Sequence, residues 1–146
     1  MRISLKTAIA ISFMLIGCAS RPRALSVHLA DYNDRPIPER LLINMPSGQA
    51  PLYAETRSVL DDRDFRSASF GDDASGQPQL RLCFAPNGRD KFISMAKQNL
   101  HRRLVFLVEG KLLFAPIIDS AAAPECLEIN GAVTPDEAAT LQRAIR

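Results

Sequence analysis

The sequence predicts an α+β domain in which a mainly antiparallel, twisted sheet carries two helices packed on one face. The main observation is the stretch 87–118, where hydrophobic residues recur first at helical spacing and then in two strand-like runs. Glu109-Gly110 separates those runs as a short turn, so a helix is followed by a hairpin. The residues at helical spacing are Phe92, Met95, Ala96, Asn99 and Leu100.

A second helix is predicted over 135–145, because its start carries residues that satisfy free backbone N–H groups. Thr134 is placed as the N-cap, Pro135 suits the first helical position, and Glu137 can close a capping box with Thr134. Shorter patterns predict strands at 52–54, 67–70, 79–84 and 126–129, and one helical turn at 60–65.

The chain is expected to comprise three segments. Residues 1–17 read as a lipoprotein signal peptide, 18–50 as a lipidated N-terminal tether with little readable pattern, and 51–146 as the folded domain. Within the middle segment, 25–30 and 41–44 are candidate strands.

The signal peptide is predicted from its charge and its hydrophobic run. Arg2 and Lys6 precede an apolar run over 7–16, which is too short to span a hydrocarbon core of about 30 Å. The run ends in Leu15-Ile16-Gly17-Cys18, which resembles the lipobox of bacterial lipoproteins. In those proteins the cysteine is acylated and becomes the first residue of the mature chain.

Cys18 is therefore the expected lipidation site and the expected membrane anchor. Ala19 follows it in place of aspartate, which by analogy with enterobacterial sorting favours the outer membrane, with the protein facing the periplasm. The alternative is an ordinary secretory signal with a chance cysteine.

The composition suits one globular domain and argues against nucleic acid as a partner. The chain has 18 Lys and Arg and 16 Asp and Glu, and two of the basic residues lie in the expected signal peptide. The remainder is nearly neutral, whereas phosphate binding needs positive charge gathered on one face.

The sequence offers no set of residues for catalysis, a metal or another cofactor, so we expect a protein that is not an enzyme. His28 and His101 are far apart, and no His or Cys spacing typical of a metal site occurs. The carboxylates of Asp61, Asp62 and Asp64 are expected to serve a helix start. A small hydrolase is kept only as a remote alternative.

Cys83 and Cys126 are the two cysteines that remain in an oxidising compartment. Alternation along the two predicted strands places both thiols on the polar faces. If the strands are neighbours, a disulfide would stabilise the domain by roughly 4 kcal/mol in the chain-entropy model. The alternative is a pair of reduced, half-buried thiols.

Both faces of the predicted hairpin are hydrophobic, so the face away from the helices needs a cover. The residues assigned to this face as a candidate partner-binding surface are Val105, Leu107, Leu113 and Ala115. Three arrangements are open: residues 25–44 fold back over it, a partner covers it, or a partner adds a strand at the sheet edge.

Residues 51–146 resemble the head subdomain of the first periplasmic loop of SecD, an accessory subunit of the protein translocase. The resemblance rests on two motif groups, Asn87-Gly88…Phe92…Asn99…Arg102-Arg103-Leu104…Glu109-Gly110-Lys111…Ala115-Pro116-Ile117-Ile118 and Gly131…Thr134-Pro135-Asp136-Glu137-Ala138-Ala139. Heads of that family usually have Thr, Gly and Asp at the positions of Ala96, His101 and Glu109, and a Gly-rich segment at the position of 121–124.

In the translocase the head is thought to hold the emerging preprotein, so the resemblance implies binding of a protein or peptide. We therefore expect a membrane-anchored lipoprotein of the cell envelope whose head-like domain binds such a partner, with a link to protein export. The alternative is a structural envelope lipoprotein.

Overall fold

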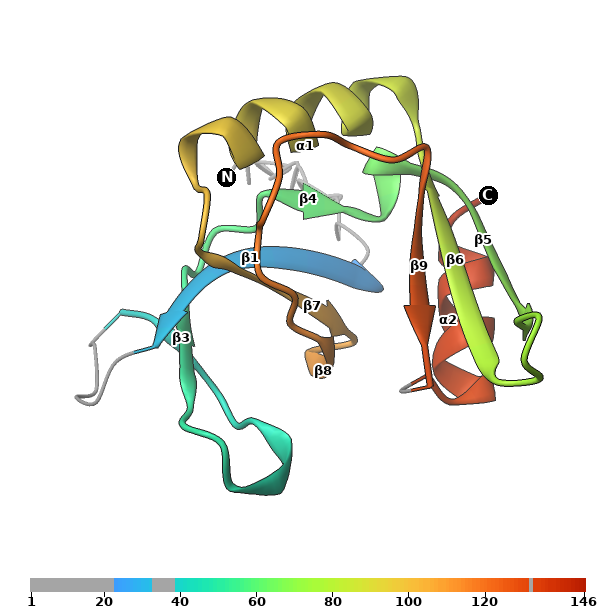
Figure 1. The fold of residues 1–146 in the computed structure, drawn as a ribbon, viewed down its shortest axis with the longest axis horizontal. Coiled ribbons are helices and arrows are strands. Elements are labelled where there is room, and N and C mark those ends of the chain that lie inside the picture. The colour runs from blue at the N-terminus through green and yellow to red at the C-terminus, as the bar shows by residue number, and fades with distance from the viewer. Residues whose placement is uncertain (1–22, 33–38, 132) are drawn as a thin grey trace, which may run out of the picture.

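A computed structural model describes residues 23–32, 39–131 and 133–146 of the chain. It has two helices and two antiparallel sheets that curl around a shared core, which confirms the predicted α+β class (Figure 1). The expected signal peptide, with Cys18 and Ala19, lies outside the described residues.

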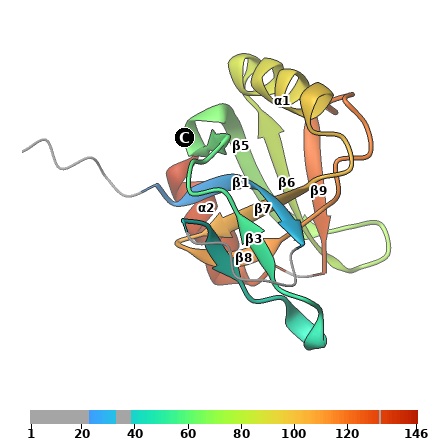
Figure 2. The same cartoon turned by 90° about the vertical axis from the view of Figure 1, so that its left-hand side faces the viewer.

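The larger sheet is built from six strands in the order β2-β3-β1-β7-β8, with β4 paired to the start of β1. Its strands are β1 (Leu25–Tyr32), β2 (Leu41–Ile43), β3 (Leu52–Ala54), β4 (Leu60–Asp61), β7 (Arg103–Val108) and β8 (Lys111–Phe114). The β2–β3 hairpin projects away from the helices, and a 3-10 turn, η1 (Pro46–Gly48), lies at its tip (Figure 2).

The folded domain starts earlier than residue 51, where the sequence analysis placed its boundary. β1 pairs with β7 over six residues and also with β3 and β4, and Leu25 and Val27 are fully buried. The candidate strand at 25–30 is therefore present, and this part of the segment expected to be a tether supplies a central strand. Its central place could not be predicted from the sequence, because that place depends on pairing with the distant strands β3, β4 and β7.

The smaller sheet has the order β5-β6-β9, with β5 (Phe65–Asp72), β6 (Pro78–Phe84) and β9 (Cys126–Asn130). A 3-10 turn, η2 (Asp62–Asp64), connects β4 to β5. All pairings in both sheets are antiparallel.

Both predicted helices are present, as α1 (Pro86–Gln98) and α2 (Pro135–Ala144). The predicted capping box is confirmed: the Glu137 N–H donates to Thr134 Oγ1 at 3.3 Å, and the Thr134 N–H donates to Glu137 Oε2 at 2.9 Å. In Figure 1, α1 runs along the top of the molecule, and α2 packs against β5 and β7.

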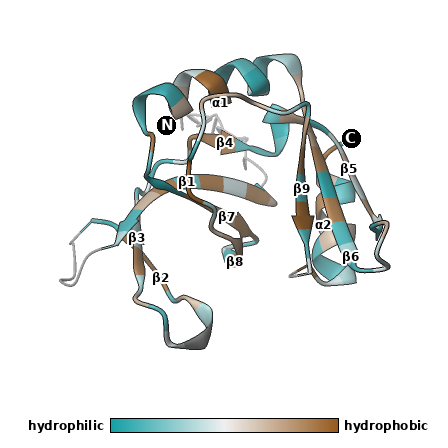
Figure 3. Cartoon of the chain, in the orientation of Figure 1, coloured by the Kyte–Doolittle hydropathy of each residue, from teal (hydrophilic) through white to brown (hydrophobic). Residues whose placement is uncertain are grey.

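The main core lies between the two sheets and receives side chains from both helices. Strongly hydrophobic positions are concentrated in β1, the β7–β8 hairpin and β9, whereas most of α1 is hydrophilic (Figure 3). From α1, Phe92 and Ala96 enter this core, and Leu141 and Ile145 enter it from the C-terminal end of the chain.

Candidate functional site

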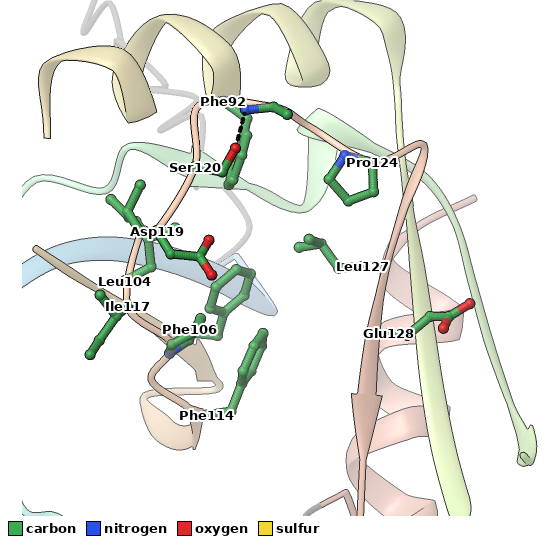
Figure 4. Close-up of a pocket in the computed structure, with 13 residues that line it drawn as sticks. Phe92, Leu104, Phe106, Phe114, Ile117, Asp119, Ser120, Pro124, Leu127 and Glu128 are labelled. Atoms are coloured by element: carbon green, nitrogen blue, oxygen red, sulfur yellow. Dashed lines mark hydrogen bonds between the residues drawn. The ribbon is translucent and has the colours of Figure 1, made fainter. Parts of the chain in front are cut away.

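An open groove of about 280 Å³ lies where the two sheets approach each other beneath α1 (Figure 4). Its floor and walls are aromatic and aliphatic. The lining side chains come from α1, β7, β8, β9 and the connection between β8 and β9, and they include Phe92, Leu104, Phe106, Phe114, Ile117 and Leu127. A concave hydrophobic surface with a few polar groups is the usual form of a binding site.

The stacked rings of Phe106 and Phe114 form one wall of the groove, with centroids 4.2 Å apart. Phe106 is buried, Phe114 is partly exposed, and Ile117 is 51% exposed. The groove therefore leaves hydrophobic area in contact with water, which a hydrophobic ligand would cover with a gain in free energy.

The charged residues that line the groove, Asp119 and Glu128, are both acidic and both exposed. Figure 4 shows the Asp119 carboxylate directed toward Phe106. Glu128 lies 3.9 Å from Arg81 on the neighbouring strand, whereas Asp119 has no ion pair within the described residues. The groove thus has a hydrophobic floor with the Asp119 carboxylate at its rim, whereas Figure 4 shows the Glu128 side chain directed away from the groove.

The connection between β8 and β9 is held in place by α1 and β7. The guanidinium of Arg89 donates two hydrogen bonds to the Ala123 carbonyl, at 3.0 and 3.3 Å. The Ile118 N–H donates to the Arg102 carbonyl at 2.8 Å, which keeps the first part of the connection beside β7. The groove wall is therefore preformed in this structure.

The four residues predicted as a partner-binding surface do not form one. Val105 and Leu107 are buried in a second, smaller core beneath β2 and β3, and Leu113 is buried in the main core. Ala115 is partly buried at the edge of the smaller core. The sequence-based assignment was therefore wrong, since three of the four side chains are covered by the chain itself.

The pairing of β7 with β8 explains why Leu113 lies on the other face: Leu112 is opposite Leu107 and shares its face, so the next residue, Leu113, points to the face of Phe106. Phe106 pairs with Phe114, whereas the next residue, Leu107, pairs with Leu112, so Leu113 is an extra residue in β8. A bulge places two consecutive side chains against one partner and shifts the alternation that follows. The residues that share the smaller core with Val105 and Leu107 come from the 25–44 segment, through Ala30 and Ile43, and from β3, through Leu52 and Ala54, so the chain itself covers this face.

The clustered aspartates serve the fold, as expected. Asp64 is buried, accepts a hydrogen bond from the Asp61 N–H at 2.9 Å, and pairs with Lys91 Nζ at 2.7 Å. Asp61 in turn pairs with Arg23 and Arg63. Burial raises the pKa of Asp61, but hydrogen bonds from Arg63 and the nearby arginine charges outweigh burial and lower it.

An ion-pair network that sequence reasoning missed joins β1 to the start of β7. Arg102 donates to both Asp31 oxygens, at 2.7 and 2.9 Å, and to Glu55 at 2.7 Å. Arg40 adds a further contact to Asp31 at 3.0 Å. The hydrogen bond from Arg102 lowers the pKa of Asp31. Asp31 and Arg102 are 71 positions apart, so no local pattern could pair them.

Cys83 and Cys126 are directly opposite each other on β6 and β9, and the structure joins them in a disulfide. His28 and His101 lie apart, and the described residues contain no group of three His, Cys, Asp or Glu side chains placed to hold a metal. In the same ranges, no helix is long and apolar enough to cross a membrane.

The decisive comparison is with protein-family models. The model of the SecDF P1 head subdomain matches residues 39–146, which is most of the chain. The chain belongs to the SecDF P1 head family. The match includes β2 and β3 and so begins before residue 51, in agreement with the structure.

Individual relatives of this SecDF head domain are subunits of the protein translocase. SecDF of Thermus thermophilus is 31% identical over 88 residues, and SecD of Acidaminococcus fermentans is 30% identical over 92. These alignments cover 60% and 63% of this chain but only 12% and 22% of the relatives. The chain therefore matches a small part of each.

Solved structures agree with this assignment. A crystal structure of SecDF in a super-membrane-facing form matches with a TM-score of 0.55 at 29% identity, covering 64% of this chain and 12% of that chain. A second structure, described as a membrane component SecDF that enhances protein export, shares the fold with a TM-score of 0.55 at 17% identity. It covers 84% of this chain and 92% of that one.

His101 is a position at which this SecDF head domain departs from the glycine that the resemblance leads us to expect. Its φ is 70°, in the left-handed region where a side chain is unfavourable. The residue ends the connection after α1, and its N–H donates to the Ile118 carbonyl at 2.8 Å. A glycine would adopt this backbone conformation without the strain that the His101 side chain brings.

Proposed function

We propose that this SecDF head domain binds extended, non-native segments of other proteins in the cell envelope, through the groove between its two sheets, and that this binding is linked to protein export. The observation that carries the proposal is the open hydrophobic groove lined by Phe106, Phe114 and Ile117. Membership of the SecDF P1 head family supports the choice of a polypeptide as ligand.

A groove of about 280 Å³ suits a few side chains of an extended segment and is too small for a folded partner. Its acidic rim also disfavours an anionic ligand such as a nucleic acid. Binding of this kind needs no chemistry, so the proposed protein is a binding module without a cofactor.

The proposal includes anchoring through an acylated Cys18, on the side of a membrane that faces the periplasm. The support is the lipobox-like sequence Leu15-Ile16-Gly17-Cys18 after a charged start and an apolar run. Labelled fatty acid should enter the wild-type protein and be absent from Cys18→Ser. Labelling of that variant would contradict the anchor and leave the groove proposal intact.

Fluorescence anisotropy tests the binding function. A labelled protein kept unfolded by reduction and carboxymethylation should bind the purified chain, whereas the same protein in its native, disulfide-bonded state should not. Equal binding of the two forms, or binding of neither, would contradict the proposal. Binding of peptidoglycan fragments alone would instead favour a structural envelope protein.

A further inference from the structure

We propose that the bound segment adds to the smaller sheet as a fourth strand, along the free edge of β9, and that its sequence alternates hydrophobic residues with lysine or arginine. This inference rests on the proposed function and specifies how the groove holds its ligand. β9 pairs only with β6, so its other edge is unpaired within the described chain. Leu127 and Glu128 of β9 line the groove.

The hydrogen bonds to β6 reveal which backbone groups of β9 are free. The Glu125 carbonyl accepts from β6 at 3.0 Å, and the Gly131 N–H donates to β6 at 2.9 Å. Because backbone direction alternates in an antiparallel strand, the odd-numbered residues between them also face β6. The N–H and C=O groups of Cys126, Glu128 and Asn130 therefore face away from β6.

Those six groups form a regular row that matches the backbone of an added strand. Neighbouring strands lie about 4.8 Å apart, so an added strand beside β9 occupies the groove. Strand addition takes its affinity from main-chain hydrogen bonds and needs little sequence preference, which suits a ligand that varies from protein to protein.

The opposite edge of the groove, formed by β8, is protected against strand addition. The bulge at Leu113 interrupts its spacing, and Pro116 lacks an N–H. The guanidinium of Arg103 donates to the Ala115 carbonyl at 2.7 Å, so that acceptor is already used. Bulges, prolines and charged side chains are the usual ways in which edge strands avoid pairing. The described part of β9 has none of these except Glu128.

The side chains beside β9 select the ligand's composition. In an added strand, residues on the side of Leu127 face the hydrophobic floor around Phe106, which favours aliphatic or aromatic side chains. Residues on the alternate side lie next to Glu128, which favours lysine or arginine. The Asp119 carboxylate lies on the Phe106 side (Figure 4), so the preference for lysine or arginine rests on Glu128.

A second copy of the chain fits this edge less well than a foreign segment does. Symmetric antiparallel pairing of two β9 edges centred on Glu128 would place the two Glu128 carboxylates opposite each other. Like charges directly opposite each other in a sheet are destabilising.

The test uses the isotope-labelled full chain and a ten-residue peptide that alternates phenylalanine with lysine. Two further peptides carry backbone N-methyl groups, either on the lysines or on the phenylalanines, so that the side chains stay the same. In antiparallel addition beside β9, the lysine amides point toward β9. Methylation there should weaken binding at least about tenfold, whereas methylation of the phenylalanine amides should change it little.

Amide exchange measured by NMR locates the edge. The unmodified peptide should slow exchange at Cys126, Glu128 and Asn130, and leave Leu112 and Ile117 on the opposite edge unchanged. Equal binding of the two methylated peptides would overturn strand addition, as would protection confined to the β8 side or protection that rises with protein concentration without peptide. If one of these results is found but the carboxymethylated, unfolded protein still binds the chain, strand addition is overturned and the proposed function stands. If the unfolded protein does not bind, both strand addition and the proposed function are overturned.

Discussion

At the scale of single residues, Gly88 shows how a side chain is excluded by close packing. A Cβ at this position of α1 would lie 2.6 and 2.8 Å from the backbone carbon and Cα of Asp64, and closer still to its carbonyl oxygen. That carbonyl also accepts a hydrogen bond from the Ala85 N–H at 2.9 Å, so it is fixed in place. The helix and the η2 turn touch here through backbone atoms.

We predict that Gly88→Ala lowers the free energy of unfolding by about 2 kcal/mol or more, because the overlap outweighs a gain in helix propensity of about 1 kcal/mol. Chemical denaturation of the variant measures the change. Gly71→Ala is the matched control, since a Cβ there meets nothing within 4 Å, and its effect should stay within about 0.5 kcal/mol. A stabilised Gly88→Ala would show that the contact with Asp64 is looser than described.

The ion pair between Asp31 and Arg102 predicts how stability depends on pH. The pKa of Asp31 is lowered in the folded state, chiefly by the hydrogen bond from Arg102. The stabilisation from the ionised Asp31 is therefore fully present above the ordinary pKa of about 3.9. It is lost as the pH falls through the lower pKa that Asp31 has in the folded state. Because the Asp31 side chain is 38% exposed, we expect the ion pair to add only about 1 kcal/mol to the free energy of unfolding.

We therefore predict that Asp31→Asn lowers stability at pH 7 by about that amount and flattens the fall in stability below pH 4. Urea denaturation between pH 2.5 and 7 measures both effects. Asp90→Asn is a suitable control, because Asp90 is exposed on α1 and takes part in none of the ion pairs within the described residues. An unchanged acid slope in Asp31→Asn would contradict the assignment of the network.

At the scale of elements, the facing positions of Cys83 and Cys126 couple β9 to the rest of the smaller sheet. We predict that protein isolated from an oxidising compartment carries this disulfide, and that replacing both residues by serine costs roughly 4 kcal/mol in the chain-entropy model. Mass analysis after alkylation without reductant checks the bond. Alkylation of both Cys83 and Cys126 without reductant would contradict the prediction.

The elements also show what the sequence could and could not predict. The α1 helix, the two-residue turn at Glu109-Gly110 and the capped start of α2 are local patterns, and all three are present. The pairing of Leu107 with Leu112 and the extra residue in β8 carry no local signal, so the face assigned to Leu113 was wrong. The groove was missed because its walls come from segments brought together only by the fold.

At the scale of the whole molecule, β1 holds the larger sheet together. It lies between β3 and β7 and buries Leu25, Val27 and Ala30 completely. We predict that a chain starting at Pro51 fails to fold, since each buried large side chain lost with β1 removes about 1.5–3 kcal/mol of stabilisation. A chain starting at Arg23 should unfold cooperatively in circular dichroism. Cooperative unfolding of the shorter chain would contradict this role for β1.

The most direct test of the groove as the binding site compares two exposed hydrophobic side chains. Ile117 is 51% exposed and lines the groove, whereas Leu42 is 54% exposed and lies on β2, outside the lining. Both variants, Ile117→Asp and Leu42→Asp, should fold, because neither side chain is buried. We predict that Ile117→Asp weakens binding of the unfolded, carboxymethylated protein at least about tenfold, while Leu42→Asp binds it as the wild type does. Equal affinity of the two variants would contradict the central claim that this groove holds the bound segment.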